Sequence, residues 1–333
     1  DGFVPLNERG TVSIAPGAGV MWRTYDDETV QTLVGAVSNY TPEDSIGLQY
    51  NTYAYSAYNT LVAGPFTWFI EGAYKTQDVF NDPFAEKTNW NAPPSRGKLV
   101  NEEGHIIYTS MSYAKKGFGI TLEARRQENF TFRTDPFVTL NQGMVNFLPP
   151  LVRFNTFRLN TRYLPATQEL GEQAIQADVS YAPSRKLRFN ANFSNINTLE
   201  ESPLYREYHI EGSYKYKRLW SIRAGLQRQE YNQEVYEGKR GAGILKTFTP
   251  FAEFLYKMDR RKAVRFELQY MYMNENEEGE KRDYGDWLFG LVEFSVAPHW
   301  TFTVSDMYNI DPGINSAVDE EGEPMPVHFP RFD

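Results

Sequence analysis

The sequence contains no cysteine among its 333 residues. This absence excludes a disulfide framework and a thiolate metal site. Long apolar runs are missing as well: nowhere do about 18 apolar residues follow one another, which excludes a transmembrane helix. The chain does not open with a basic segment followed by an apolar one, so we expect that, if the protein is exported, this sequence is its mature form.

A surplus of basic residues is also absent. The formal net charge is -9, with 34 Lys and Arg against 43 Asp and Glu. Binding to nucleic acid requires a basic face that neutralises phosphates, and no such face is evident in the sequence. We therefore expect no nucleic-acid partner.

The most informative feature that is present is a strict alternation of apolar and polar side chains. In AVRFELQYMYM, residues 263–273, Val264, Phe266 and Leu268 alternate with Arg265 and Glu267. The same period of two recurs over 187–194 and 157–163. It places the two kinds of side chain on opposite faces of a β-strand. Runs of roughly ten such residues exceed the usual soluble strand and match the length that crosses a bilayer as a tilted strand.

The composition agrees with strands that have one apolar face. Hydrophobic residues make up 41% and aromatic residues 15% of the chain, yet the mean hydropathy of -0.56 is too polar for a helical membrane protein. A barrel explains both values, because half of each strand faces lipid and half faces water. We predict an all-β fold: one domain over residues 1–333, forming a closed antiparallel transmembrane β-barrel in the outer membrane of a Gram-negative cell.

The alternation predicts about fifteen strands and connections of two kinds. Short connections such as 114–117 and 257–262 carry Lys and Arg, whereas 76–104, 128–153 and 274–286 are longer and polar. Short periplasmic turns and longer extracellular loops have this rhythm in outer-membrane barrels. The predicted strands are 12–22, 30–38, 46–55, 66–75, 105–113, 118–127, 154–163, 174–181, 187–193, 205–216, 219–229, 245–256, 263–273, 287–296 and 300–309.

Aromatic residues flank the short connections. Five of them also share parity with the apolar face of their strands, as expected of a girdle at the depth of the lipid headgroups. The alternative explanation is that aromatic residues simply favour strands. The predicted girdle consists of Phe118, Tyr181, Trp220, Tyr256 and Trp300.

Two soluble folds compete with the barrel. A β-propeller repeats a motif about every 40 to 45 residues, and the sequence shows no such repeat. A β-sandwich buries its apolar faces against each other and leaves polar residues outside, so periodicity alone does not separate it from a barrel. Strand length and the unequal connections favour the barrel.

The C-terminal third carries distinctive phrases. EFSVAPHW at 293–300 and VSDMY at 304–308, within the stretches 247–273 and 287–309, resemble an uncharacterised family of outer-membrane barrel proteins from Bacteroidota. YNQEVYEGKRG at 231–241 looks like a loop of the same family, so the similarity spans 205–309. The resemblance implies location and fold, and it implies no activity. Members of that family look longer, so we expect 16 to 18 strands in the intact protein, of which about fifteen are visible here.

The polar faces would form the lumen of a closed barrel. Charges there are tolerated when they are paired or wet. They can line an aqueous pore, or they can form salt bridges that fill the lumen, and loops such as 76–104 or 128–153 can fold inside as a plug. The predicted lumen-lining residues are Arg158, Arg162, Arg188, Asn190, Asn192, His209, Glu211, Arg223, Glu253, Arg265, Glu267 and Glu293.

Few residues suggest catalysis. Of four His, His105 and His209 have inward parity, and Glu211 follows His209 on the same face, as a base and its partner would. The sequence shows no nucleophile motif, so a hydrogen-bond network in the lumen is the favoured reading. We predict no catalytic residue and no enzymatic activity.

Two acidic loops, 274–286 and 319–323, invite a calcium site. Neither loop has the spacing of an EF-hand loop. A solvated surface that faces lipopolysaccharide is the favoured reading. We predict no metal site and no cofactor.

The sequence as a whole predicts a porin-like channel for small solutes, surrounded by membrane lipid and lipopolysaccharide. The alternative is a non-conducting structural or accessory subunit that contacts other outer-membrane proteins, for example through Tyr231, Tyr236 and residues 311–333. A third hypothesis is an outer-membrane hydrolase in which His209 serves as the base.

Overall fold

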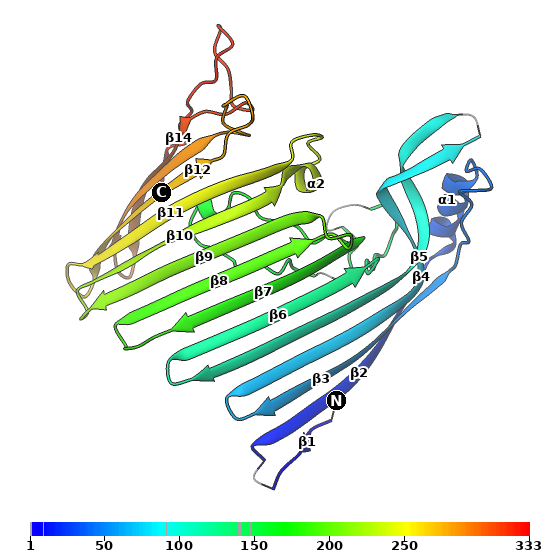
Figure 1. Cartoon of the computed structure of the whole chain (residues 1–333), viewed down its shortest axis with the longest axis horizontal. Coiled ribbons are helices and arrows are strands. Elements are labelled where there is room, and N and C mark those ends of the chain that lie inside the picture. Colours follow the sequence, from blue (N-terminus) through cyan, green and yellow to red (C-terminus); the bar gives the residue numbers. More distant parts are fainter. Residues whose placement is uncertain (1, 9, 91, 139–141, 147) are drawn as a thin grey trace.

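The strands form one antiparallel sheet that curls along its length (Figure 1). The computed structural model describes all residues except 1, 9, 91, 139–141 and 147. Fifteen strands follow one another in sequence order, and each pairs with its sequence neighbours. The predicted all-β antiparallel fold is therefore confirmed.

The elements in chain order are β1 (Val4–Pro5), β2 (Val12–Thr24), α1 (Asp27–Val37), β3 (Asn51–Ala63), β4 (Phe66–Asn89), β5 (Ala92–Lys115), β6 (Phe118–Glu128), η1 (Leu159–Thr161), β7 (Gly171–Tyr181), β8 (Leu187–Asn197), β9 (Pro203–Tyr216), β10 (Trp220–Asn232), α2 (Gln233–Glu237), β11 (Ile244–Lys257), β12 (Lys262–Met273), β13 (Asp286–Val296), β14 (Trp300–Asp311) and β15 (Arg331–Phe332).

The two ends of the sheet do not meet. β1 pairs with β2 over Val4 and Pro5, and β15 pairs with β14 over Arg331 and Phe332. Within the described part of the chain, no hydrogen bond joins the first strand to the last. The sheet is thus an open, curled ribbon of strands. The C-terminal residues 327–333 lie along the outer edge of β14 from Thr303 to Asn309, whereas the outer edge of β2 has partners among the described residues only over 12–16.

The two faces of the sheet differ in chemistry. On the concave face, directly paired positions form a mostly polar row from β8 to β14: Arg188, Ser213, Arg223, Glu253, Glu267, Leu291 and Ser305. On the convex face, directly paired positions form an apolar row from β8 to β14: Leu187, Tyr214, Ile222, Phe254, Phe266, Val292 and Val304.

Among the described residues, no second layer covers the convex face. The side chains of Phe189 and Phe266 remain 45% and 47% exposed. A sandwich would bury both of them against a facing sheet. The alternation in the sequence therefore reflects one sheet with an uncovered apolar face.

Connections at the two rims of the sheet differ as predicted. Tight turns such as 116–117, 217–219 and 297–299 join strands at one rim, and the long connections 129–170 and 274–285 leave the other. Lys116 and Lys217 adopt positive φ, the conformation that closes such tight turns. The predicted alternation of short and long connections is confirmed for these elements.

The predicted strand at 30–38 is wrong, because these residues form helix α1. Asp26 caps the helix by accepting a hydrogen bond from the Thr29 amide at 2.8 Å. The apolar residues Val30, Leu33 and Val37 recur at helical spacing, and Leu33 is fully buried. The next strand, predicted at 46–55, is shifted and occupies β3.

The predicted loop at 76–104 is also wrong. β4 and β5 continue through it as a long hairpin, which projects beyond the rim beside α1 (Figure 1). Val79 and Leu99 on the hairpin pack against Leu33 of the helix in a small separate core. Burial against this helix stabilises strand structure where the sequence shows mainly polar residues.

The predicted strand at 154–163 is wrong as well. Residues 129–170 form one long connection, called the inserted segment below, whose only regular element among the described residues is η1. Phe157, Leu159 and Tyr163, the apolar set of the alternation, are 1%, 0% and 3% exposed. The pattern correctly identified side chains that avoid water, but they are buried against the sheet and not on its convex face.

Candidate functional site: the concave face and its inserted segment

The inserted segment packs on the concave face of the sheet. Leu159 and Tyr163 belong to a buried cluster with Leu245, Met271 and Trp287 from β11, β12 and β13. Burial of these apolar side chains stabilises the position of the segment on the sheet. Other parts of the segment contact strands β2, β4, β6 and β9 on the same concave face.

Specific hydrogen bonds fix the position of the segment. The backbone amide of Leu159 donates to Gln269 Oε1 at 2.7 Å, and Gln227 Nε2 donates to the carbonyl of Asn160 at 3.3 Å. The ring of Phe157 lies 4.2 Å from the ring of Phe251, measured between centroids. Polar side chains of the sheet thus satisfy backbone groups of the segment that would otherwise be buried without partners.

Ion pairs hold the two flanks of the segment. Arg125 of β6 contacts Glu172 at 2.5 Å and donates to the carbonyl of Pro149 at 2.6 Å. Arg153 within the segment contacts Glu211 of β9 at 3.2 Å. Both arginines are therefore engaged by carboxylates of the sheet.

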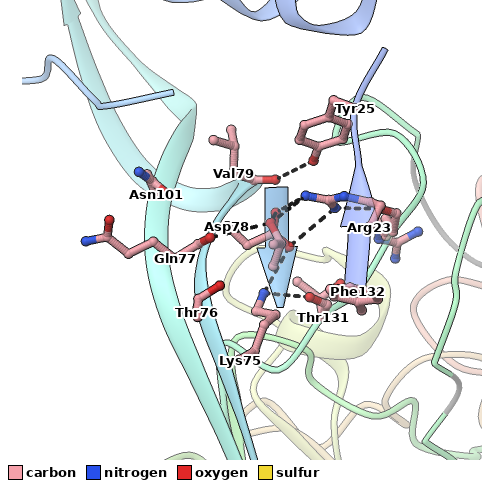
Figure 2. Close-up of polar contacts among 12 residues, drawn as sticks. Arg23, Tyr25, Lys75, Thr76, Gln77, Asp78, Val79, Asn101, Thr131 and Phe132 are labelled. Carbon is pink, nitrogen blue, oxygen red and sulfur yellow. Dashed lines mark hydrogen bonds and ion pairs between the residues drawn. The ribbon is translucent and has the colours of Figure 1, made fainter. Parts of the chain in front are cut away.

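A buried cluster of charges holds the start of the segment (Figure 2). Asp78 contacts Arg23 at 2.5 Å and Lys75 at 3.2 Å, and all three side chains are at most 8% exposed. Lys75 also donates to the carbonyl of Thr131, and Arg23 to that of Arg133, each at 2.6 Å. One carboxylate is therefore shared by two cations that bind the backbone of the segment.

Most predicted lumen-lining residues lie on the concave face. Arg265 lies 3.2 Å from Glu253, 3.0 Å from Glu267 and 3.0 Å from Glu293. Glu211 accepts from Arg223 at 2.7 Å, and also from Asn190 and Arg153. Asn192 lies on the same face, and Arg188 shares its parity. The side chains on this face form mixed-sign networks that the sequence pattern placed on one side of the sheet.

Arg158 and Arg162 are not strand residues. Arg158 precedes η1, and the guanidinium of Arg162 lies 4.5 Å from the ring centroid of Trp287. Both belong to the inserted segment. Their predicted place on a strand was wrong because the strand over 154–163 does not exist.

His209 lies in a closed environment. It is fully buried, its ring stacks on Phe251 with 5.4 Å between centroids, and its Nε2 lies 3.4 Å from Glu211. Because Glu211 is already shared with Arg223 and Asn190, the His–Glu pair is part of a hydrogen-bond network. The inward orientation predicted for His105 is wrong, since its side chain is 51% exposed while Ile106 lines the cavity described below.

The five predicted girdle residues lie at the rim of the short turns. Phe118 and Trp220, the first residues of β6 and β10, are paired with Tyr181 and Tyr256 at the ends of β7 and β11. Trp300 is 64% exposed at the start of β14. All five have the parity of the convex face.

A cavity of about 720 Å³ remains between the inserted segment and strands β4 to β8. We call it the concave chamber. The segment contributes an apolar wall that includes Leu148, Pro150 and Val152, and the sheet contributes Glu71 and Glu123. Its presence did not follow from the sequence, because no pattern showed where the segment folds back.

Three further observations concern the described residues. Among the described residues, no group of three or more potential ligands could hold a metal ion. No helix in the described part of the chain is long and apolar enough to cross a membrane. Tyr231 is buried and its ring lies 4.9 Å from that of Tyr236, so it is not the surface contact that the sequence predicted.

The chain belongs to a family of unknown function, DUF6029, whose model matches residues 17–329. No curated protein matches the chain. Among solved structures, it is similar to mutants of the Rh. blastica porin: one shares 9% identity, with a TM-score of 0.28, over 89% of this chain and 94% of the porin. Another has 9% identity and a TM-score of 0.29 with the same coverage.

We expect Asp78→Asn to destabilise the protein by about 3–5 kcal/mol, because it leaves Arg23 and Lys75 buried without a counter-charge. Denaturant unfolding of the purified protein measures the change. Glu86→Gln, on the exposed part of the β4–β5 hairpin, removes the same charge and should cost less than about 0.5 kcal/mol. Equal effects of the two substitutions would show that the buried cluster does not contribute to stability.

A second carboxylate, Asp283 in the connection 274–285, predicts a pH dependence. It accepts hydrogen bonds from Tyr163, Gln233, Lys239 and Asn315. Burial raises the pKa of Asp283. The hydrogen bonds from the Lys239 ammonium and from the neutral donors lower the pKa by more than burial raises it, so the net pKa lies below the ordinary value of 3.8. The stabilisation is therefore complete above pH 3.8 and is lost as the pH falls below that value.

We expect Asp283→Asn to lower the free energy of unfolding by about 1–3 kcal/mol at pH 7. The difference between the variant and the wild type should shrink below pH 3.8, where the native carboxylate takes up a proton. The free energy of unfolding of both proteins, measured at pH 7 and below pH 3.8, tests this expectation. A difference that does not change with pH would contradict the role assigned to the ionised carboxylate.

Proposed function

We propose that the chain forms a closed β-barrel in a Gram-negative outer membrane and passes small solutes through a charged lumen that the inserted segment narrows. The observation that carries this proposal is the contrast between the two faces of one sheet. The convex face presents an apolar row from Leu187 to Val304, and the concave face carries the ion-pair network around Arg265. An uncovered apolar band suits acyl chains, and a charged concave face suits water.

Strand length and rim chemistry support the membrane location. Strands such as β7 and β8 have 11 residues, which matches the number that crosses a bilayer at a tilt. The predicted girdle lies at the short-turn rim, where aromatic rings would meet headgroups. Exposed Glu277 and Glu278 in the connection 274–285 lie at the opposite rim, where they would face lipopolysaccharide.

The proposal requires the sheet to close. In hydrocarbon, each unpaired backbone group costs several kcal/mol, so open edges do not occur in contact with lipid. Among the described residues, the outer edge of β2 has partners only over 12–16, and the segment 327–333 that pairs with β14 has no strand on its other side. We therefore propose that the unpaired edges at the two ends of the sheet are paired in the membrane. The number of 16 to 18 strands stays a prediction.

The inserted segment narrows the lumen and does not line it evenly. Its buried cluster with β11 to β13 occupies the part of the concave face near the long connections. The network around Arg265 remains about a quarter exposed nearer the short-turn rim, where Arg265 has 28% and Glu253 26% exposure. A solute would meet a wide charged vestibule on one side and a constriction on the other.

The test is single-channel conductance of the purified protein in planar bilayers. The wild type should conduct, and Arg265→Gln should shift selectivity toward cations because three carboxylates lose their shared cation. Arg240→Gln, in an exposed connection, is the matched control and should leave selectivity unchanged. Absence of current above the lipid background would eliminate the channel.

A non-conducting scaffold is the second candidate, and one observation favours it. The inserted segment is held by a large apolar cluster and by buried ion pairs, as a permanent plug would be. The same bilayer experiment separates the two functions, since a scaffold predicts a correctly inserted protein without current. The hydrolase hypothesis gains nothing from His209, whose ring is stacked and buried.

A further inference from the structure

The concave chamber combines an apolar wall with carboxylates that lack a cationic partner. On its sheet side, Glu71 of β4 makes no hydrogen bond or ion pair with any described residue, although it lines the chamber. Glu123 of β6 accepts a short hydrogen bond from the hydroxyl of Tyr108, which is a neutral donor. These two carboxylates therefore face the chamber without a counter-charge.

The cations near the chamber are already engaged. Arg125 is 3% exposed and bound to Glu172 and to the backbone of Pro149. Arg153 is shared between Glu211 at 3.2 Å and Asp178 at 3.5 Å. Neither arginine is available to neutralise Glu71 or Glu123. The chamber therefore carries an excess of negative charge on the side formed by β4 and β6.

The register places the two carboxylates around one tyrosine. Glu71 is directly opposite Tyr108 across β4 and β5, and Tyr108 is directly opposite Arg125 across β5 and β6. Glu123 lies on the diagonal of that second pair, at the position opposite Ser110. A cation in front of Tyr108 can therefore meet a carboxylate on either side.

The other wall of the chamber is apolar. It comes from the inserted segment and includes Phe130, Leu148, Pro150, Val152 and Phe154, and the side chain of Phe154 is 71% exposed. An inorganic cation prefers several oxygen ligands and gains nothing from such a wall. The volume of about 720 Å³ lies within the usual range of sites for small organic ligands.

We propose that the concave chamber binds a small organic ammonium ion, with the charged group between Glu71 and Glu123 and the apolar body against the inserted segment. A cation there would neutralise carboxylates that lack a partner, and the apolar wall would lose water on binding. The inference goes beyond the proposed channel, because binding on the concave face requires no conduction.

Calorimetric titration of the purified full chain in a non-ionic detergent tests the proposal. The probe is phenethylammonium, compared with the neutral 2-phenylethanol and the anionic phenylacetate, which have nearly the same shape. Saturable binding of the ammonium probe, at least about tenfold tighter than either analogue, is expected from a charge-assisted contact. Equal affinity for the alcohol, a preference for the acid, or no saturable binding would overturn the proposal.

Matched variants assign the binding to the chamber. Glu71→Gln with Glu123→Gln should weaken binding of phenethylammonium at least about tenfold and leave binding of the alcohol unchanged. Glu277→Gln with Glu278→Gln removes the same charge from an exposed connection and should change nothing. If both double variants bind as the wild type does, the carboxylates of the chamber do not recognise the probe.

A third variant separates shape from charge. Gln176→Trp places a large side chain in the chamber without altering its charge, so all probes should lose binding while the thermal unfolding transition stays in place. Probe binding that survives this substitution in a folded protein would place the site elsewhere. Saturable binding by a protein that conducts no current would eliminate the channel and leave this inference intact.

Discussion

The separation of apolar and polar side chains onto the two faces of one sheet is the constraint on which the rest of the structure depends. Because successive residues of a strand point to opposite faces, shifting a strand by one residue would exchange Phe266 with Arg265. Each strand is therefore held in one register by the chemistry of both faces. The paired rows across β8 to β14 show that this register is kept from strand to strand.

The concave face can accept the inserted segment because it is polar at many positions and apolar at a few. Gln269 and Gln227 bind backbone groups of the segment, and Met271 and Leu245 bury its apolar side chains. A fully charged concave face would bind only water, and a fully apolar one would leave the backbone of the segment without partners. This combination of polar and apolar side chains explains how the inserted segment, which contains no strand among its described residues, stays fixed on the concave face.

The sequence predicted the sheet well because alternation is a direct consequence of strand geometry. β9 to β14 lie close to their predicted ranges, and the rows that contain Phe254 and Glu253 have the predicted orientations. The wrong assignments share a cause. Over 30–38 the spacing of the apolar residues also fits a helix, and over 154–163 it fits a strand. In both segments, the surface that buries these residues comes from distant parts of the chain. No local sequence pattern shows which distant surface buries these residues.

The candidate site could be predicted only in part for the same reason. The parity of Glu211, Arg223, Glu253 and Arg265 was visible in the sequence, so their common face followed. Their partners were not visible, because the contact of Arg153 with Glu211 joins residues 58 positions apart. The cluster of Arg23, Lys75 and Asp78 and the concave chamber depend on where the inserted segment folds back, which is set by tertiary contacts.

The most direct test of the account is the environment of alternate residues along one strand in a lipid bilayer. Since the chain has no cysteine, single cysteines at positions 264 to 268 can each carry a spin label. The account predicts that labels at 264, 266 and 268 are accessible to oxygen in the hydrocarbon, and that labels at 265 and 267 are accessible to a water-soluble relaxant. Labels at 264, 266 and 268 that are shielded from lipid would contradict it.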